Sequence, residues 1–159
     1  VLLILGIAAA AVTLNVRPSL RSMRWEEARA KIAAFDRLTR RQAREHDVEL
    51  RVLVDLDEAS LRRMETDEGG TDGGARMTLG AGCKVLPLWV AGSRIPGGRG
   101  SIPFSRQGLS PSYALHVRTE EGRQRWLYVA GPTGQAIDVN EEKELAEIFE
   151  KVASGPDAG

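Results

Sequence analysis

Residues 1–16 read VLLILGIAAAAVTLNV and include no charged side chain. As a helix, these sixteen residues extend about 24 Å, less than the ~30 Å hydrocarbon core of a bilayer. A few apolar residues before Val1 would complete a membrane span, so we expect the run to continue upstream. No small-residue cleavage site closes it before Arg17, which argues against a secretory signal peptide. The alternative is a buried core helix, because runs of this length fit both environments.

A second helical pattern follows directly and ends near His46. Apolar residues recur every three to five positions between charged ones, which predicts an amphipathic helix. Pro18 stands at the junction and is expected to kink one long helix or begin a new one. The side chains expected to pack on the rest of the fold are Leu20, Met23, Ile32, Phe35 and Leu38.

The formal net charge is zero, with 22 basic and 22 acidic residues, but the charges are unevenly placed. Residues 17–46 hold nine basic and four acidic residues, and residues 47–159 hold 13 basic and 18 acidic ones. A basic segment after an apolar run indicates a membrane surface or an acidic partner. The alternative is a solvated helix face that needs no partner. Zero net charge argues against nucleic-acid binding by bulk charge.

From Val48 onwards the period becomes two. Val48, Leu50, Val52 and Val54 point one way and Glu49, Arg51 and Asp55 the other, which predicts a half-buried strand. Residues 61–64 are too short to assign, and 120–123 form a predicted hairpin turn. A short final helix is predicted with Asn140 as its cap, Gly155 at its stop and an apolar stripe of Leu145, Ile148, Phe149 and Val152. The further predicted strands are 84–90, 101–105, 113–119, 124–130 and 135–139.

This order of elements predicts an α+β fold: one long N-terminal helix packed on an antiparallel sheet domain, and a short C-terminal helix. The 159 residues suffice for one compact domain. The predicted parts are the apolar helix 1–16, the amphipathic helix 17–46, the β domain 47–139 and the helix with its tail 140–159.

Few residues suit catalysis. Cys83 is the only cysteine, and His46 and His116 are the only histidines. A thiol–imidazole pair has no local signature here, and a lone cysteine is more often a small buried hydrophobe. We therefore expect no enzymatic activity, no cofactor and no metal centre.

Three features of the sequence could indicate binding sites, but each has a plainer interpretation. The acidic loop 65–74, ETDEGGTDGG, lacks the alternating pattern of a calcium loop, so a solvated loop is favoured. Glycines 97, 98 and 100 lack the ending of a phosphate-binding loop and favour a turn. Three tryptophans could stack on single-stranded nucleic acid, but residues 47–159 are net negative, so no nucleic-acid partner is expected. They are Trp25, Trp89 and Trp126.

The chain resembles the type IV pilin and pseudopilin superfamily. VLLILGIAAAAV, with Gly6 inside the run, looks like the apolar half of a prepilin-type segment, and Pro18 falls near a proline common in pilins. FDRLTRRQAREHDVELRV, IPFSRQG, YALHVRT and RWLYVAGPTGQ are similar to segments of the minor pseudopilin H class of type II secretion. The landmarks in this sequence are Phe104, Gly108, Thr133 and Gly134.

This resemblance implies a structural subunit that helps to start or cap a secretion pseudopilus. It implies a processed and methylated prepilin-type N-terminus, a single-pass position in the bacterial inner membrane, and a periplasmic globular domain. The partners would be other pilin-like subunits, the inner membrane and the secretion machinery. Alternatives are a DNA-uptake or type IV minor pilin, and a membrane-anchored periplasmic domain that binds but does not polymerise. The membrane or filament helix would comprise Val1, Leu2, Leu3, Ile4, Leu5, Gly6, Ile7, Ala8, Ala9, Ala10, Ala11 and Val12.

Overall fold

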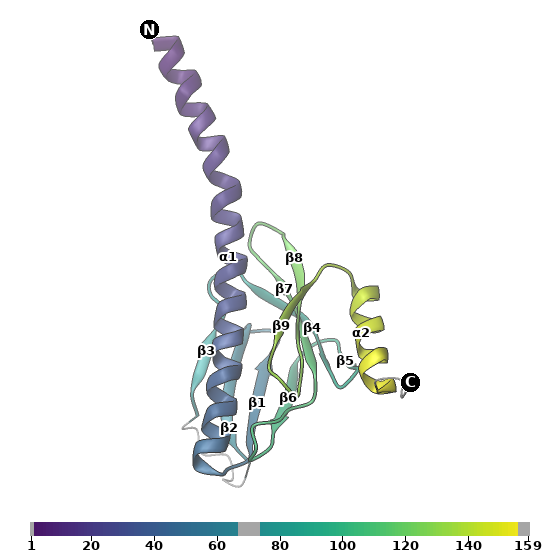
Figure 1. Ribbon diagram of the computed structural model, residues 1–159. Coiled ribbons are helices and arrows are strands. Elements are labelled where there is room, and N and C mark those ends of the chain that lie inside the picture. The colour runs from purple at the N-terminus through teal and green to yellow at the C-terminus, as the bar shows by residue number, and fades with distance from the viewer. Residues whose placement is uncertain (1, 67–73, 156–159) are drawn as a thin grey trace.

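A single long helix dominates the molecule. The computed structural model describes residues 2–66 and 74–155, and the side chains within 24–66 and 74–155. Helix α1 spans Leu2–His46 without interruption, so the helix assignment runs through the proline at position 18. The N-terminal half of α1 projects beyond both sheets, and only its second half lies against them (Figure 1).

Nine strands and a second helix follow α1 in the described chain. They form two antiparallel sheets, a four-stranded one in the order β3-β2-β1-β6 and a five-stranded one in the order β5-β4-β7-β8-β9. The elements are β1 Leu50–Asp55, β2 Ser60–Glu65, β3 Arg76–Thr78, β4 Lys84–Val90, β5 Ser93–Ile95, β6 Arg99–Phe104, β7 Tyr113–Arg118, β8 Gln124–Val129, β9 Ala136–Val139 and α2 Glu142–Ser154.

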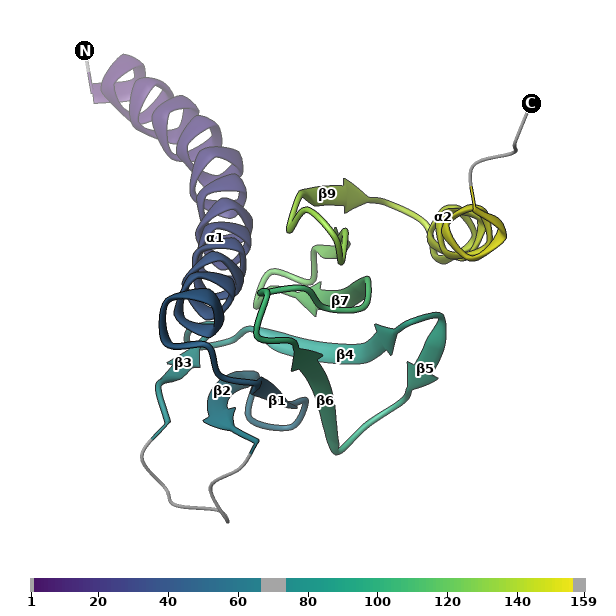
Figure 2. The same cartoon turned by 60° about the horizontal axis from the view of Figure 1, so that its bottom comes forward.

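The core lies between α1 and the inner faces of the two sheets (Figure 2). In β1 the residues Leu50, Val52 and Val54 are buried, while the alternating Arg51 is exposed, as the period of two predicts. Both sheets contribute to one apolar cluster with α1, through residues such as Leu61 of β2 and Leu127 of β8. The architecture is therefore α+β, as the sequence predicts.

A second apolar cluster joins α2 to the opposite face of the five-stranded sheet. Leu145 and Phe149 of α2 are buried there against Trp126 and Tyr128 of β8, and the Phe149 ring meets the Tyr128 ring edge-on at 5.4 Å. Val152 is 54% exposed, so the predicted apolar stripe ends one turn early.

Several boundaries differ from those predicted. The N-cap of α2 is Glu141 rather than Asn140, and its side chain makes no capping hydrogen bond. Gly155 closes α2 with φ of 71°, as expected for a helix stop.

The hairpin predicted at 120–123 is confirmed, because the Gly122 amide donates to the Thr119 carbonyl at 2.9 Å.

The strands β2, β3 and β5 were absent from the sequence prediction. Strand β2 reads SLRRME and has no clean alternation, because its burial decreases along the strand instead of alternating. Strands β3 and β5 have three residues each, too few for a period to be read. Pairing with longer neighbours orders all three, with β2 on β1, β3 on β2 and β5 on β4.

Candidate functional site: the helix–sheet interface

The second half of α1 presents one buried stripe to the sheets. Trp25, Ala28, Ile32, Phe35 and Ala43 lie on it, at intervals that follow the helical period. The structure thus places two of the predicted packing residues, Ile32 and Phe35, in the core.

One predicted packing position on α1, Leu38, lies outside this stripe. Leu38 is 54% exposed, so its predicted packing role is wrong. At 100° per residue it points about 110° away from the centre of the stripe, and Thr39 and Arg40 are buried instead. The side chains of Leu20 and Met23 lie outside the described residues, as do those of the predicted membrane or filament helix, residues 1–12. Their roles remain predictions.

A buried ion pair lies beside the stripe, between Phe35 and Ala43 in the sequence. The Arg40 Nε lies 2.6 Å from Oδ2 of Asp36, one helical turn earlier, and the two side chains are only 6% and 1% exposed. The phenol of Tyr113 donates to Asp36 Oδ1 at 2.9 Å. Burial and the Asp36 carboxylate raise the pKa of Tyr113 well above its usual value, so the phenol stays protonated and keeps donating.

The remaining donors of Arg40 hold two loops against the helix. One terminal nitrogen donates to the carbonyls of Gly108 and Gly131 at 3.1 and 2.6 Å. The other donates to Asp36 Oδ1 at 3.2 Å and to Ser110 Oγ at 2.8 Å. With the Nε bond, all five guanidinium N–H groups have an acceptor. We call the side chains of Asp36, Arg40, Ser110 and Tyr113 the helix clasp.

Glycines let these loops approach the clasp. Gly134 has φ of +70°, and a Cβ there would lie 2.8 Å from Arg40 Nε and 3.0 Å from Asp36 Oδ2. Gly108 has φ of +72°, and a Cβ there would lie 2.7 Å from the Arg40 carbonyl oxygen. Phe104 lies under the Arg40 guanidinium, 5.3 Å from ring centroid to Cζ. Three of the four sequence landmarks therefore surround one arginine.

A second set of polar contacts joins α1 to β9, closer to the N-terminus of the helix than the helix clasp. Asp138 of β9 accepts hydrogen bonds from Trp25 Nε1 at 3.2 Å and from Arg29 Nε at 2.8 Å. The Arg125 guanidinium lies 6.0 Å from the Trp25 ring centroid and 3.7 Å from Asp138 Oδ2. Trp25 is buried, so its ring is unavailable for base stacking.

Many basic residues of α1 pair within the molecule. Arg24, for example, contacts Glu120 and Glu121 at the β7–β8 turn, at 2.7 and 2.8 Å, and both contacts raise its pKa. Of the seven basic residues whose side chains the structure describes in 17–46, five have such ion pairs, and they are Arg24, Arg29, Lys31, Arg40 and Arg41. Much of the basic segment therefore serves the fold.

The candidate chemical groups are dispersed. Cys83 is half-buried beside the core, where burial raises its pKa, and His116 stacks on Trp126 with ring centroids 4.4 Å apart. A Cβ at Gly100 would lie 2.3 Å from Leu88 Cδ2, so this glycine allows close packing between the sheets. Among the described residues no three His, Cys, Asp or Glu side chains form a metal-binding group. Most of the acidic loop 65–74 lies outside those residues.

Comparisons with known proteins identify the fold. No protein-family model matches the chain, and no curated protein matches it. Among solved structures, it is similar to the minor pseudopilin EpsH from the type 2 secretion system of Vibrio cholerae, with a TM-score of 0.53 at 13% identity. The alignment covers 73% of this chain and 97% of that pseudopilin. The chain therefore has a minor-pseudopilin fold, which confirms the fold that the sequence resemblance implies.

Proposed function

We propose that this chain is a minor pilin-like subunit of a type II secretion pseudopilus. Its role would be structural, in starting the filament or assembling its tip. The observation that carries the proposal is the form of α1, whose first half projects beyond the sheets while its second half is fastened to them (Figure 1). The minor-pseudopilin fold supports the same role.

The projecting half of α1 has the composition that subunit packing needs. Residues 1–16 are uncharged, and Gly6 with the alanines at 8–11 would let neighbouring helices approach closely. A lipid-embedded helix satisfies its own backbone hydrogen bonds, so the same segment can hold the subunit in the membrane before assembly. We propose the bacterial inner membrane for this segment and the periplasm for the sheet domain. In the described part of the chain, no helix meets the length and hydropathy that a membrane crossing requires.

Site-directed crosslinking tests the proposal in cells. Cys83 is the only cysteine, so Cys83→Ala provides a cysteine-free background. Ala9→Cys in the apolar run should then crosslink to other pilin-like subunits. The control is Glu144→Cys on the exposed side of α2, which should give far less product. Deleting the gene should also reduce secretion.

Two outcomes would contradict the proposal. Membrane attachment without crosslinks, together with normal secretion after deletion, would indicate an anchored binding domain that never polymerises. Salt-sensitive DNA binding by the full chain would indicate a DNA-uptake subunit instead.

A further inference from the structure

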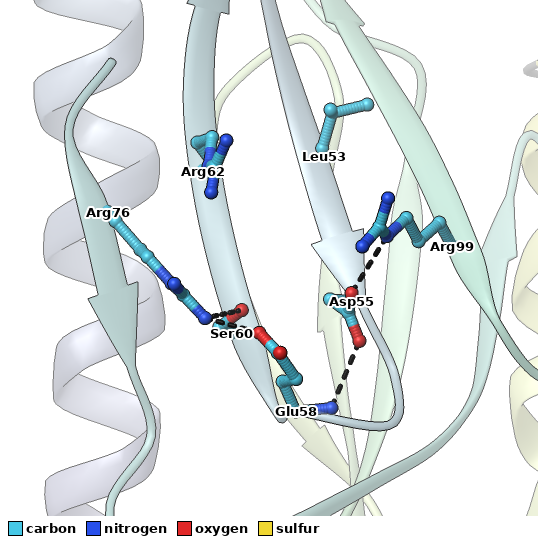
Figure 3. Close-up of a pocket in the computed structure, with 7 residues that line it drawn as sticks. All are labelled: Leu53, Asp55, Glu58, Ser60, Arg62, Arg76 and Arg99. Carbon is cyan, nitrogen blue, oxygen red and sulfur yellow. Dashed lines mark hydrogen bonds and ion pairs between the residues drawn. The ribbon is translucent and has the colours of Figure 1, made fainter. Parts of the chain in front are cut away.

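The outer face of the four-stranded sheet carries a charged groove of about 80 Å³ (Figure 3). It opens on the side away from the core, because Leu53 and Asp55 alternate along β1 with the buried Val52 and Val54. All four strands or their turns contribute to its lining, which consists of Leu53, Asp55, Glu58, Ser60, Arg62, Arg76 and Arg99.

Positive charge spreads across this groove, while negative charge is confined to one end. Arg62, Arg76 and Arg99 come from three different strands, β2, β3 and β6. Both carboxylates, Asp55 and Glu58, lie at the β1–β2 turn (Figure 3). The exposed Arg51 adds another positive charge on the same face of β1, four residues before Asp55. We call the surface of these four arginines the arginine face.

The ion pairs of Arg76 and Arg99 leave these two guanidinium groups able to accept a further anion. Arg99 Nε lies 2.9 Å from Asp55 Oδ2, and the Arg99 side chain is 77% exposed. Arg76 pairs with Glu58, and these two side chains are 44% and 58% exposed. Exposed pairs of this kind contribute at most about 1 kcal/mol. A guanidinium has five donors and binds carboxylates through two parallel hydrogen bonds, so a partner carboxylate can add to these pairs or replace them.

We infer that the arginine face is a docking surface for an acidic segment of another protein chain. Leu53 lies half-buried among the arginines and offers an apolar contact to the aliphatic part of a glutamate side chain. In an extended segment, side chains on one face recur about every 6.8 Å. A segment with a glutamate at every second position would therefore present a row of carboxylates to the groove.

The same groove is poorly suited to nucleic acid. Single-strand binding relies on aromatic side chains that stack on bases, and no aromatic residue lines the described groove. Trp25 and Trp126 are buried elsewhere. Asp55 and Glu58 would repel a continuous row of phosphates, whereas an acidic peptide can place a neutral or basic residue opposite them. This inference goes beyond the proposed filament role and does not depend on it.

Peptide binding by the full chain in neutral detergent tests the inference. The probe is a fluorescein-labelled peptide of alternating Glu and Ala, followed by anisotropy. Combining Arg76→Gln with Arg99→Gln should weaken binding by at least about tenfold, since the loss of a single charged hydrogen bond already has an effect of this size. Combining Arg37→Gln with Arg106→Gln removes the same charge from exposed positions outside the groove. This control should change the dissociation constant less than about twofold.

A variant that binds the peptide more tightly cannot be explained by misfolding. Glu58→Gln removes a repelling carboxylate and should tighten binding by about two- to threefold. Binding should also weaken between low and moderate salt. Equal weakening by the control pair, or unchanged binding after Glu58→Gln, would overturn the inference. Tighter binding of a single-stranded DNA 12-mer than of the peptide would overturn it in favour of nucleic acid.

Discussion

Arg40 places a charged group inside the molecule, which costs free energy unless every donor finds an acceptor. Here every donor does, with acceptors on α1 and on loops 68 to 91 residues further along the chain. Such a network sets both the rotation of α1 and its position along the sheets, because a shift of one residue would break the three hydrogen bonds from Arg40 to Gly108, Gly131 and Ser110. An interface of apolar contacts alone would allow α1 more variation in its rotation and position.

Removing one partner of the ion pair should be costly. We predict that Arg40→Met lowers the free energy of unfolding by about 3–5 kcal/mol, because Asp36 would remain buried and unpaired. Urea unfolding followed by tryptophan fluorescence measures this. Adding Asp36→Leu should recover much of the loss, since an apolar pair can replace a buried ion pair. A double variant that is as unstable as both single changes combined would show that the pair is not coupled.

Gly134 allows a second residue-scale test. We predict that Gly134→Ala destabilises the fold by about 2–4 kcal/mol, because the strain of a positive φ adds to a clash with Arg40 and Asp36. Gly122 has a similar φ of +80° and nothing within 4 Å of an added Cβ, so Gly122→Ala isolates the strain, about 1 kcal/mol. Equal melting temperatures for the two variants would argue against close contact at the clasp.

His116 makes stability depend on pH. Burial lowers its pKa in the folded protein below 6.5, the value for an unperturbed histidine. The unfolded chain therefore binds the proton more readily, and the free energy of unfolding should fall as the pH drops below about 6.5. His116→Phe keeps the stacking on Trp126 and should flatten this dependence between about pH 7.5 and 5.5. A steeper decline in the variant would contradict the assignment.

At the level of elements, strong periodicity was readable from the sequence, and long-range polar contacts were not. The alternation of β1 and the helical period of α1 each reflect one buried face, so local pattern sufficed. The spacing of Asp36 and Arg40 matches an i,i+4 pair on a solvated helix, and nothing nearby shows that both are buried. Their burial depends on Gly108 and Gly131, which approach only in the folded chain. The prediction for Leu38 was wrong for a related reason, because the neighbouring buried positions hold the polar residues Thr39 and Arg40.

Two residues on α1 test the position of that stripe. We predict that Phe35→Ala costs about 3–5 kcal/mol, because Phe35 lies in the core. Leu38→Ala, three residues later and exposed, should change stability by less than about 0.5 kcal/mol. Both changes shorten an apolar side chain on the same helix, and alanine favours the helix more than phenylalanine does, so helix propensity cannot explain a larger loss for Phe35→Ala. A larger loss of stability for Leu38→Ala than for Phe35→Ala would show that the face of α1 with Leu38, not the face with Phe35, is buried.

At the scale of the whole molecule, the two halves of α1 have different environments. The second half is fastened by the helix clasp and by Asp138, and its apolar residues complete the core. The first half projects from the sheets (Figure 1). Stability of the sheet domain should therefore depend on the second half alone. Under the proposed function, the first half would contact lipid or other subunits.

Deleting residues 1–16 tests this division directly. The remaining 143 of the 159 residues retain the buried stripe, both sheets and α2, which is ample for one core. We predict that this fragment is soluble and unfolds cooperatively, whereas the intact chain requires detergent or lipid because its apolar run has no polar face. Circular dichroism and sedimentation of both proteins measure these properties. An aggregated fragment beside a detergent-free soluble parent would mean that residues 1–16 complete the core, and neither the membrane role nor the filament role would survive.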